Sequence, residues 1–221
     1  MTMRSALDRA REAPQSTKAR ILATAEDVFA HRGFAGASTR EIAAKAGVNI
    51  SSLHYHWESK ETLYFAVFQN IYDRIVEVVR TAMPETVDRA RSRDIIENVM
   101  GTLFDYFADH PNLPKLLVRR LLENEEGPAA IERDVLVPAW HLFAEWMHGR
   151  GGPALGDLDA QLFMLTIHNV LLLYLLDSRH YASLLGGSVH DPDVRARVRR
   201  YIIDLVPLLL GSRLPSRPPQ T

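Results

Sequence analysis

Apolar residues recur along most of the chain at intervals of three and four, which is the period of an α-helix, and no segment alternates as a strand does. The first stripe runs from Ile21 to Phe29 and predicts a helix over Thr17–His31 that stops at Gly33. Further helices are predicted at Ser38–Gly47, Asn49–Trp57, Ser59–Ala82, Asp94–Asp109, Asn112–Asn124, Pro128–His148, Asp157–Asp177 and Pro192–Leu210. An all-α fold is therefore expected.

Local signals fix the ends of the short helices. Ser38 and Glu41 are spaced as a capping box, in which the Ser38 hydroxyl accepts the Glu41 amide and the Glu41 side chain reaches back. Gly47 ends that helix, because glycine readily adopts the conformation that follows a last helical turn. The segment after it, Asn49–Trp57, carries small hydroxyl and aromatic-polar side chains and few aliphatic ones. Such a segment is expected to face something other than the core.

Composition restricts the chemistry. The 221 residues contain no cysteine, which excludes disulfides, thiolate nucleophiles and cysteine-ligated zinc. The N-terminus lacks the apolar core of a secretion signal, and the longest apolar run, Val170–Leu176, is far shorter than the roughly 20 residues that span a bilayer. A cytoplasmic protein without a membrane partner is expected. Residues 1–60 carry nine basic and six acidic residues, whereas the remainder is net acidic, which favours an anionic partner for the N-terminal part.

Two short helices joined by the Gly47-Val48 turn outline a helix-turn-helix, whose second helix enters the major groove of DNA. Val48 and Leu53 are spaced to anchor that helix on its neighbours. Short polar side chains on its other face would let the backbone approach DNA and reach phosphates and base edges. The candidate contacts are Asn49, Ser51, Ser52, His54, Tyr55 and His56, with Lys60 at the start of the next helix, where free amides also favour phosphate. The alternative is a helical corner whose polar face meets water.

The run ILATAEDVFAHRGFAGASTREIAAKAGVNISSLHYHWESKETLYFAVF resembles the N-terminal domain of the TetR/AcrR family of transcriptional repressors. The matching features are Phe29, Gly33-Phe34, Ser38-Thr39, Glu41-Ile42-Ala43, Gly47-Val48, Leu53, Tyr55-His56-Trp57, Lys60-Glu61 and Leu63. Together they cover roughly residues 15–75, a third of the chain. The resemblance implies that Thr39 and Arg40 contact phosphate and bases, and that Tyr55 and Lys60 contact phosphate. His54 departs from the Tyr of most relatives, so it is either a variant contact or a partly buried filler.

The same resemblance implies the organisation of the whole chain. Residues 1–14 are expected to be a flexible arm, 15–75 the DNA-binding domain, 76–210 an effector-binding and dimerisation domain, and 211–221 a flexible tail. The expected function is that of a one-component regulator, most often a repressor. It would bind a near-palindromic operator in double-stranded DNA as a homodimer and be released by a small-molecule effector. Neither catalysis nor a cofactor is expected.

The resemblance also implies that the effector domain holds a small molecule in its core and dimerises through its last two long helices. The candidate walls of an effector pocket are Phe104, Phe107, Leu117, Trp140, Phe143, Met164 and His168. Dimerisation is expected through the last two long helices, because the Leu158–Leu176 helix is too apolar to face water. The final helix contributes the stripe Val194, Val198, Ile202, Leu205 and Leu209.

A metal-dependent helical enzyme is the alternative function. His141, Glu145 and His148 share one helical face, and Glu145-x-x-His148 has the spacing of di-iron helix bundles. Those sites need a second copy of the motif, and the sequence contains none, so a polar surface is the favoured interpretation. His54 and His56 point to different sides of a helix and do not form a metal pair. No metal site is predicted.

Overall fold

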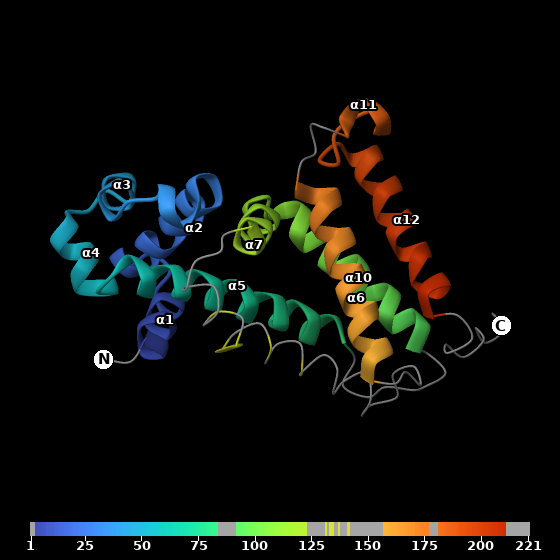
Figure 1. The fold of residues 1–221 in the computed structure, drawn as a ribbon, viewed down its shortest axis with the longest axis horizontal. Helices are drawn as coiled ribbons and strands as arrows, with labels where there is room; N and C mark the ends of the chain where they lie inside the picture. Colours follow the sequence, from blue (N-terminus) through green and yellow to red (C-terminus); the bar gives the residue numbers. More distant parts are fainter. Residues whose placement is uncertain are drawn as a thin grey trace. The chain divides into compact units, whose positions relative to one another are not determined.

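The computed structural model describes residues 3–83, 92–122, 131, 133–134, 137, 141, 157–176 and 181–210. Every regular element in this described part is a helix (Figure 1), which confirms the all-α fold class. None of these helices is both long and apolar enough to cross a membrane. The order is α1 (Met3–Glu12), α2 (Thr17–Gly36), α3 (Thr39–Lys45), α4 (Ile50–Trp57), α5 (Lys60–Ala82), α6 (Ser92–Asp109), α7 (Asn112–Leu122), α10 (Asp157–Leu176), α11 (Ala182–Leu185) and α12 (Pro192–Leu210).

The chain divides into two compact units. The first contains Met1–Arg74 together with Lys115–Val137, and the second contains Ile75–Pro114 together with Pro138–Thr221. The sequence predicted a DNA-binding domain made of one continuous segment that ends at residue 75. The structure instead adds a later segment, which includes the C-terminal half of α7, to the same unit.

Residues 3–12 form a helix and not part of the flexible arm that the sequence predicted for residues 1–14. Met3–Glu12 forms α1, which contacts α2 and buries Leu7 and Ala10. The Arg11 guanidinium donates to Asn70 Oδ1 at 3.0 Å and to Asp73 Oδ2 at 2.7 Å, which ties α1 to α5. A helix of ten residues is unstable alone in water, so these tertiary contacts, which a local pattern does not reveal, stabilise it.

α2 is longer than predicted and is interrupted at Gly33. Gly33 has a φ of 71°, a conformation that favours glycine, and the helix continues to Gly36. Arg119 of α7 donates to the carbonyl oxygens of Ala30 and His31, both at 3.0 Å, just before the interruption. Lys60 Nζ donates to the carbonyl oxygens of Phe34 and Ala37, at 2.9 and 3.3 Å, after it. Two cations therefore satisfy carbonyl groups that the interrupted helix leaves open.

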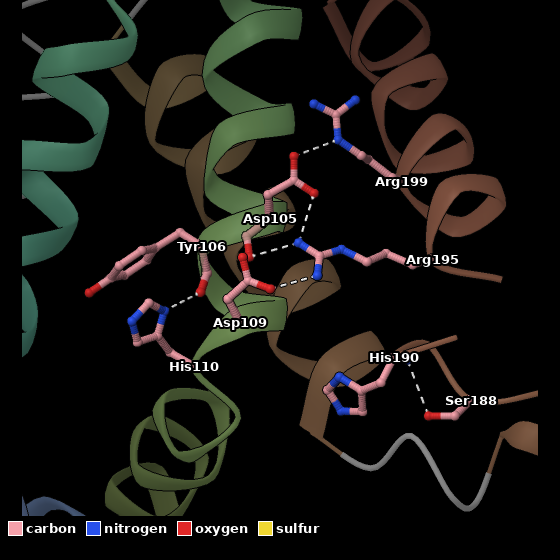
Figure 2. Close-up of polar contacts among 8 residues, drawn as sticks. All are labelled: Asp105, Tyr106, Asp109, His110, Ser188, His190, Arg195 and Arg199. Atoms are coloured by element: carbon pink, nitrogen blue, oxygen red, sulfur yellow. Dashed lines mark hydrogen bonds and ion pairs between the residues drawn. The ribbon is translucent and has the colours of Figure 1, made fainter. Parts of the chain in front are cut away.

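In the second unit, α6 contacts α10 and α12, and ion pairs join α6 to α12 (Figure 2). Arg195 pairs with Asp109 at 2.6 Å and with Asp105 at 3.1 Å, while Arg199 Nε donates to the other Asp105 oxygen at 2.8 Å. A Cβ atom at Gly101 would overlap the Arg199 guanidinium as it is placed here, so a larger residue would require that side chain to shift. These contacts fix the register of α12 on α6.

The predicted dimerisation stripe of α12 is wrong in its first three members. Val194, Val198 and Ile202 are buried within the unit itself, as are Val206 and Leu210. Because α6 and α10 contact α12 within the unit, its most regular apolar stripe is used for the core. The exposed face of α12 instead carries Arg197, Tyr201, Asp204 and Leu208, and α10 exposes Leu162, Leu165 and Leu173.

Candidate nucleic-acid interface

The helix-turn-helix is built from α3 and α4, which contact each other and α2. Ser38 Oγ accepts the Glu41 amide at 3.1 Å, which confirms the first half of the capping box. The Glu41 carboxylate instead lies 3.4 Å from Lys45 Nζ. Gly47 has a φ of 67°, and the Val48 amide donates to Ala43 O at 3.0 Å, so the chain turns sharply into α4.

Two side chains anchor α4 on the unit. Leu53 is fully buried, as the sequence predicted, and Trp57 is 1% exposed. Trp57 Nε1 donates to Lys18 O at 3.3 Å, and Lys18 Nζ lies 5.2 Å from the centroid of the indole ring. Val48, the other predicted anchor, is only half-buried. These contacts hold the inner face of α4 and leave its outer face free to meet a partner.

The outer face of α4 carries the predicted contact residues. Tyr55 is 83% exposed, and its ring meets the half-buried His56 ring edge to face with centroids 5.1 Å apart. Asn49, Ser51 and His54 are exposed, and Ser52 is half-buried. His54 is therefore not a buried filler, and its Nδ1 lies 3.0 Å from Glu58 O. α4 thus presents one large aromatic side chain among short polar ones.

Asn49 has a structural role that the sequence analysis missed. Its Oδ1 accepts the Ser52 amide at 2.7 Å, so it is the N-cap of α4. The signal was present, because asparagine is a preferred N-cap residue and stands directly before the helix. Both amide hydrogens of Asn49 remain available for a DNA contact, which stays a prediction.

The other predicted contacts lie on α3 and at the start of α5. Thr39 is half-buried and Arg40 is exposed in the first turn of α3. Lys60 is half-buried, with its ammonium bound to the two α2 carbonyls and 4.2 Å from the centroid of the Phe34 ring. Lys60 thus stabilises α2 directly, and its contact with phosphate stays a prediction.

The ionisable side chains around the C-terminal end of α4 are basic. Burial, followed by the charge of Arg9, lowers the pKa of Lys18. Burial, followed by the charges of Lys18 and Arg9, lowers the pKa of His56. Three positively charged or ionisable side chains from α1, α2 and α4 therefore lie within Coulomb range of one another.

The structure describes five of the seven residues that were predicted to line an effector pocket. Phe104, Phe107 and Leu117 are buried, and Met164 and His168 are half-buried, while Trp140 and Phe143 lie outside the described residues. An open pocket of about 450 Å³ is lined by Glu77, Val78, Thr81, Ala82, Asn98 and Thr102, none of which was predicted.

The alternative metal site also lies mostly beyond the described part. His141 is exposed, and Glu145 and His148 lie outside the described residues. Within the described residues no group of His, Asp and Glu side chains is arranged to hold a metal ion.

Comparison with known proteins places the candidate interface in a family of DNA-binding regulators. A family model described as bacterial regulatory proteins, tetR family, matches residues 21–67, which include α3, α4 and the start of α5. The HTH-type transcriptional activator FasR of Mycolicibacterium smegmatis is 41% identical over 81 residues, which are 36% of this chain and 37% of FasR. The HTH-type transcriptional repressor Rv3405c of Mycobacterium tuberculosis is 28% identical over 187 residues, which are 77% of this chain and 96% of that protein.

The fold is shared over most of the chain. The transcriptional regulator FadR of Bacillus subtilis, solved in complex with stearoyl-CoA, matches with a TM-score of 0.64 and 16% identity, over 87% of this chain and 97% of FadR. The similarity to FasR, by contrast, spans little more than a third of that protein. The similarity to FasR therefore covers 36% of this chain, while the fold shared with FadR covers 87% of it.

Proposed function

Because this chain belongs to the TetR family of helix-turn-helix transcriptional regulators, we propose that it is a cytoplasmic repressor that binds a near-palindromic operator as a homodimer and is released by a small-molecule effector. The observation that carries the proposal is the outer face of α4, where the exposed Tyr55 stands among short polar side chains while Leu53 and Trp57 anchor the inner face. Short polar side chains on a helix that is anchored from its other side support the proposal, because they let the backbone approach the base edges in the major groove.

Sequencing the genomic fragments that the purified protein retains tests this proposal. We expect a small set of fragments that share an inverted repeat with half-sites about 34–36 Å apart, which is one turn of DNA. Retention of random fragments only, together with stoichiometric bound metal, would instead support the enzyme alternative. The retained promoters also provide the template for measuring whether transcription falls or rises, which matters because the relatives include both an activator and a repressor.

Replacing Tyr55 with alanine should weaken binding to operator and to random DNA by the same factor, about 5- to 20-fold. Tyr55 is assigned to a phosphate, and phosphate contacts carry no sequence information. The dependence on salt should stay unchanged, because the phenol is neutral and releases no counterion. Fluorescence anisotropy with both duplexes at several salt concentrations measures these quantities.

The matched control for Tyr55 is Tyr181→Ala, since Tyr181 is an exposed tyrosine of the second unit that is not assigned to DNA. It should bind like the wild type. Loss of discrimination between the duplexes in Tyr55→Ala would assign Tyr55 to a base, and unchanged affinity would remove it from the interface. Lys60 is a poorer test, because its replacement also removes a cap of α2.

The effector is proposed to act through α5. This helix starts at Lys60 in the first unit and ends at Ala82 in the second, so it is a continuous connection between the two. An effector that prefers one arrangement of this helix shifts the equilibrium between DNA-binding and released states, and the preference must be differential. Long-chain acyl-CoA is the first class to titrate, because the structurally similar FadR was solved with stearoyl-CoA.

Operator DNA should weaken binding of the true effector by the same factor by which the effector weakens binding of the operator. Coupling of about 1–3 kcal/mol, or roughly 5- to 150-fold, is usual for such systems. Calorimetric titration of the effector, with and without saturating operator, measures one factor, and anisotropy with and without effector measures the other. If an effector releases DNA but binds equally well to both forms, coupling between two distinct sites is rejected.

A further inference from the structure

An open pocket of about 450 Å³ lies between the last turns of α5 and the middle of α6. This volume falls in the range of about 300–1,000 Å³ that is usual for small-molecule sites. Four residues of α5 and two of α6 line it, namely Glu77, Val78, Thr81, Ala82, Asn98 and Thr102. All of them belong to the second unit, so the pocket is defined within one compact part of the chain. We call it the α5–α6 pocket.

The hydroxyl groups of the α5–α6 pocket have already donated their hydrogens. Thr81 Oγ1 donates to Glu77 O at 2.8 Å, and Thr102 Oγ1 donates to Asn98 O at 2.9 Å, each one turn back in its own helix. A hydroxyl that has donated its hydrogen keeps its lone pairs, so each threonine is left as an acceptor. Asn98 Nδ2 donates one hydrogen to Ala82 O at 2.9 Å, and the Asn98 Oδ1 atom is a further acceptor.

The charges around the α5–α6 pocket favour a cation. Glu77 lines the pocket, and hydrogen bonds from Arg80 to its two oxygens, at 2.8 and 2.6 Å, lower the pKa of its carboxyl group. Arg80 balances part of this negative charge, but none of the six lining residues is basic. α5 ends at Ala82, and the C-terminal end of a helix carries a partial negative charge that favours cations.

We propose that the α5–α6 pocket binds a small organic amine, whose ammonium group donates to the threonine and Asn98 oxygens while its apolar body lies against Val78 and Ala82. An ammonium group has donor hydrogens and no acceptor, so it complements a lining that offers mostly acceptors. A carboxylate or a phosphate would instead face lone pairs and the charge of Glu77. This inference goes beyond the proposed function, because it holds whether or not the chain binds DNA.

The test is titration of the full-length protein with phenethylamine, phenethyl alcohol and phenylacetate, which share an aromatic body and differ in the polar group. Methyl NMR observes the pocket directly, because Val78, Thr81, Ala82 and Thr102 all carry methyl groups. We expect phenethylamine to shift these signals and to bind at least about 10-fold more tightly than the alcohol, because its hydrogen bonds are charge-assisted. Phenylacetate should leave the signals unchanged.

Conservative variants test the acceptors. Thr81→Val and Thr102→Val replace a hydroxyl with a methyl group of similar shape, and each should weaken phenethylamine about 2- to 10-fold, the value of one hydrogen bond. Thr166→Val is the matched control, since Thr166 Oγ1 donates to Leu162 O at 2.8 Å in the same way on α10 and does not line the pocket. It should bind phenethylamine like the wild type. Glu77→Gln should reduce the preference for phenethylamine over the alcohol.

Several results would overturn the proposal. Wild-type affinity for phenethylamine in both Thr81→Val and Thr102→Val would reject the threonine oxygens as its acceptors. Equal binding of the amine and the alcohol, or tighter binding of phenylacetate, would reject the ligand class. Methyl shifts confined to other parts of the chain, or no saturable binding at millimolar concentration, would reject the site. No DNA is present in these titrations, so any of these results leaves the proposed function intact, and that function fails separately if the protein retains no operator.

Discussion

Leu208→Glu is expected to convert the proposed dimer to a monomer and to lower operator affinity at least 100-fold. Leu208 is 76% exposed on α12, and its neighbours one and two turns earlier on the same face are Asp204 and Tyr201. On α10, Leu162, Leu165 and Leu173 are exposed on one face as well. Exposed leucines on two long helices are typical of a surface that is buried against a second copy of the chain in a dimer.

Two contributions determine how much operator affinity Leu208→Glu is expected to lose. A stable homodimer of this class buries more than about 2,000 Å², and a carboxylate in its centre has no partner. Separation of the two recognition helices then removes the gain from binding both half-sites together, which is about 10²- to 10⁴-fold. Sedimentation at micromolar concentration measures the association state, anisotropy measures affinity, and circular dichroism confirms that the helices are retained.

Two companion variants separate the dimer surface from the core. Leu184→Glu introduces the same charge at a residue that is 82% exposed on α11, and it should remain dimeric. Ile202→Glu replaces a fully buried residue on the opposite face of α12 and should unfold the second unit rather than release intact monomer. A Leu208→Glu protein that sediments as the wild type does would exclude α12 from the interface.

Trp57→Ala should destabilise the first unit by about 3–5 kcal/mol, as is usual when a buried Trp or Phe is truncated. Trp57 is 1% exposed, donates to Lys18 O and lies beneath the Lys18 ammonium, so its loss leaves a cavity between α4 and α2. Because total stability is typically only about 5–15 kcal/mol, the recognition helix should no longer be held in place. Urea unfolding followed by circular dichroism measures the change.

Trp57→Phe and Tyr55→Ala are the controls for this prediction. The phenylalanine keeps an aromatic ring in the site, loses the hydrogen bond at a cost of about 0.5–1.5 kcal/mol, and leaves a smaller cavity than alanine does, so it should destabilise the unit less than Trp57→Ala. Tyr55→Ala removes an exposed ring of the same helix and should lower DNA affinity with an unchanged unfolding midpoint. A wild-type midpoint in Trp57→Ala would mean that the indole does not anchor α4.

The helices of the DNA-binding part were predictable because their determinants are local. The Ser38 cap, the Gly47 turn and the bounds of α5 at Lys60 and Ala82 are all set by residues within one turn of where they act. Leu53 was predictable as an anchor for the same reason, since helical spacing alone turns it inward.

Other features were missed because they depend on distant residues. Residues 3–12 form a helix because they pack against the rest of the first unit. The contacts that hold this helix include the one from Arg11 to Asp73, which lies some sixty positions later in the sequence. The stripe on α12 was identified correctly as apolar, but periodicity does not say whether such a stripe faces the chain's own core or a second copy. The role of Lys60 was hidden in the same way, because the Phe34 and Ala37 carbonyl groups that it binds lie at the end of α2, more than twenty positions earlier in the sequence.

The late position of Arg119 has a consequence for synthesis of the chain. Its guanidinium binds the Ala30 carbonyl, 89 positions earlier in the sequence. At roughly 5–20 residues per second, the ribosome adds Arg119 about 4–18 s after Ala30. For that time the nascent helix-turn-helix exists without its final cap, although α3 and α4 have already been made. The recognition helix is therefore translated well before the last segment of the unit that holds it.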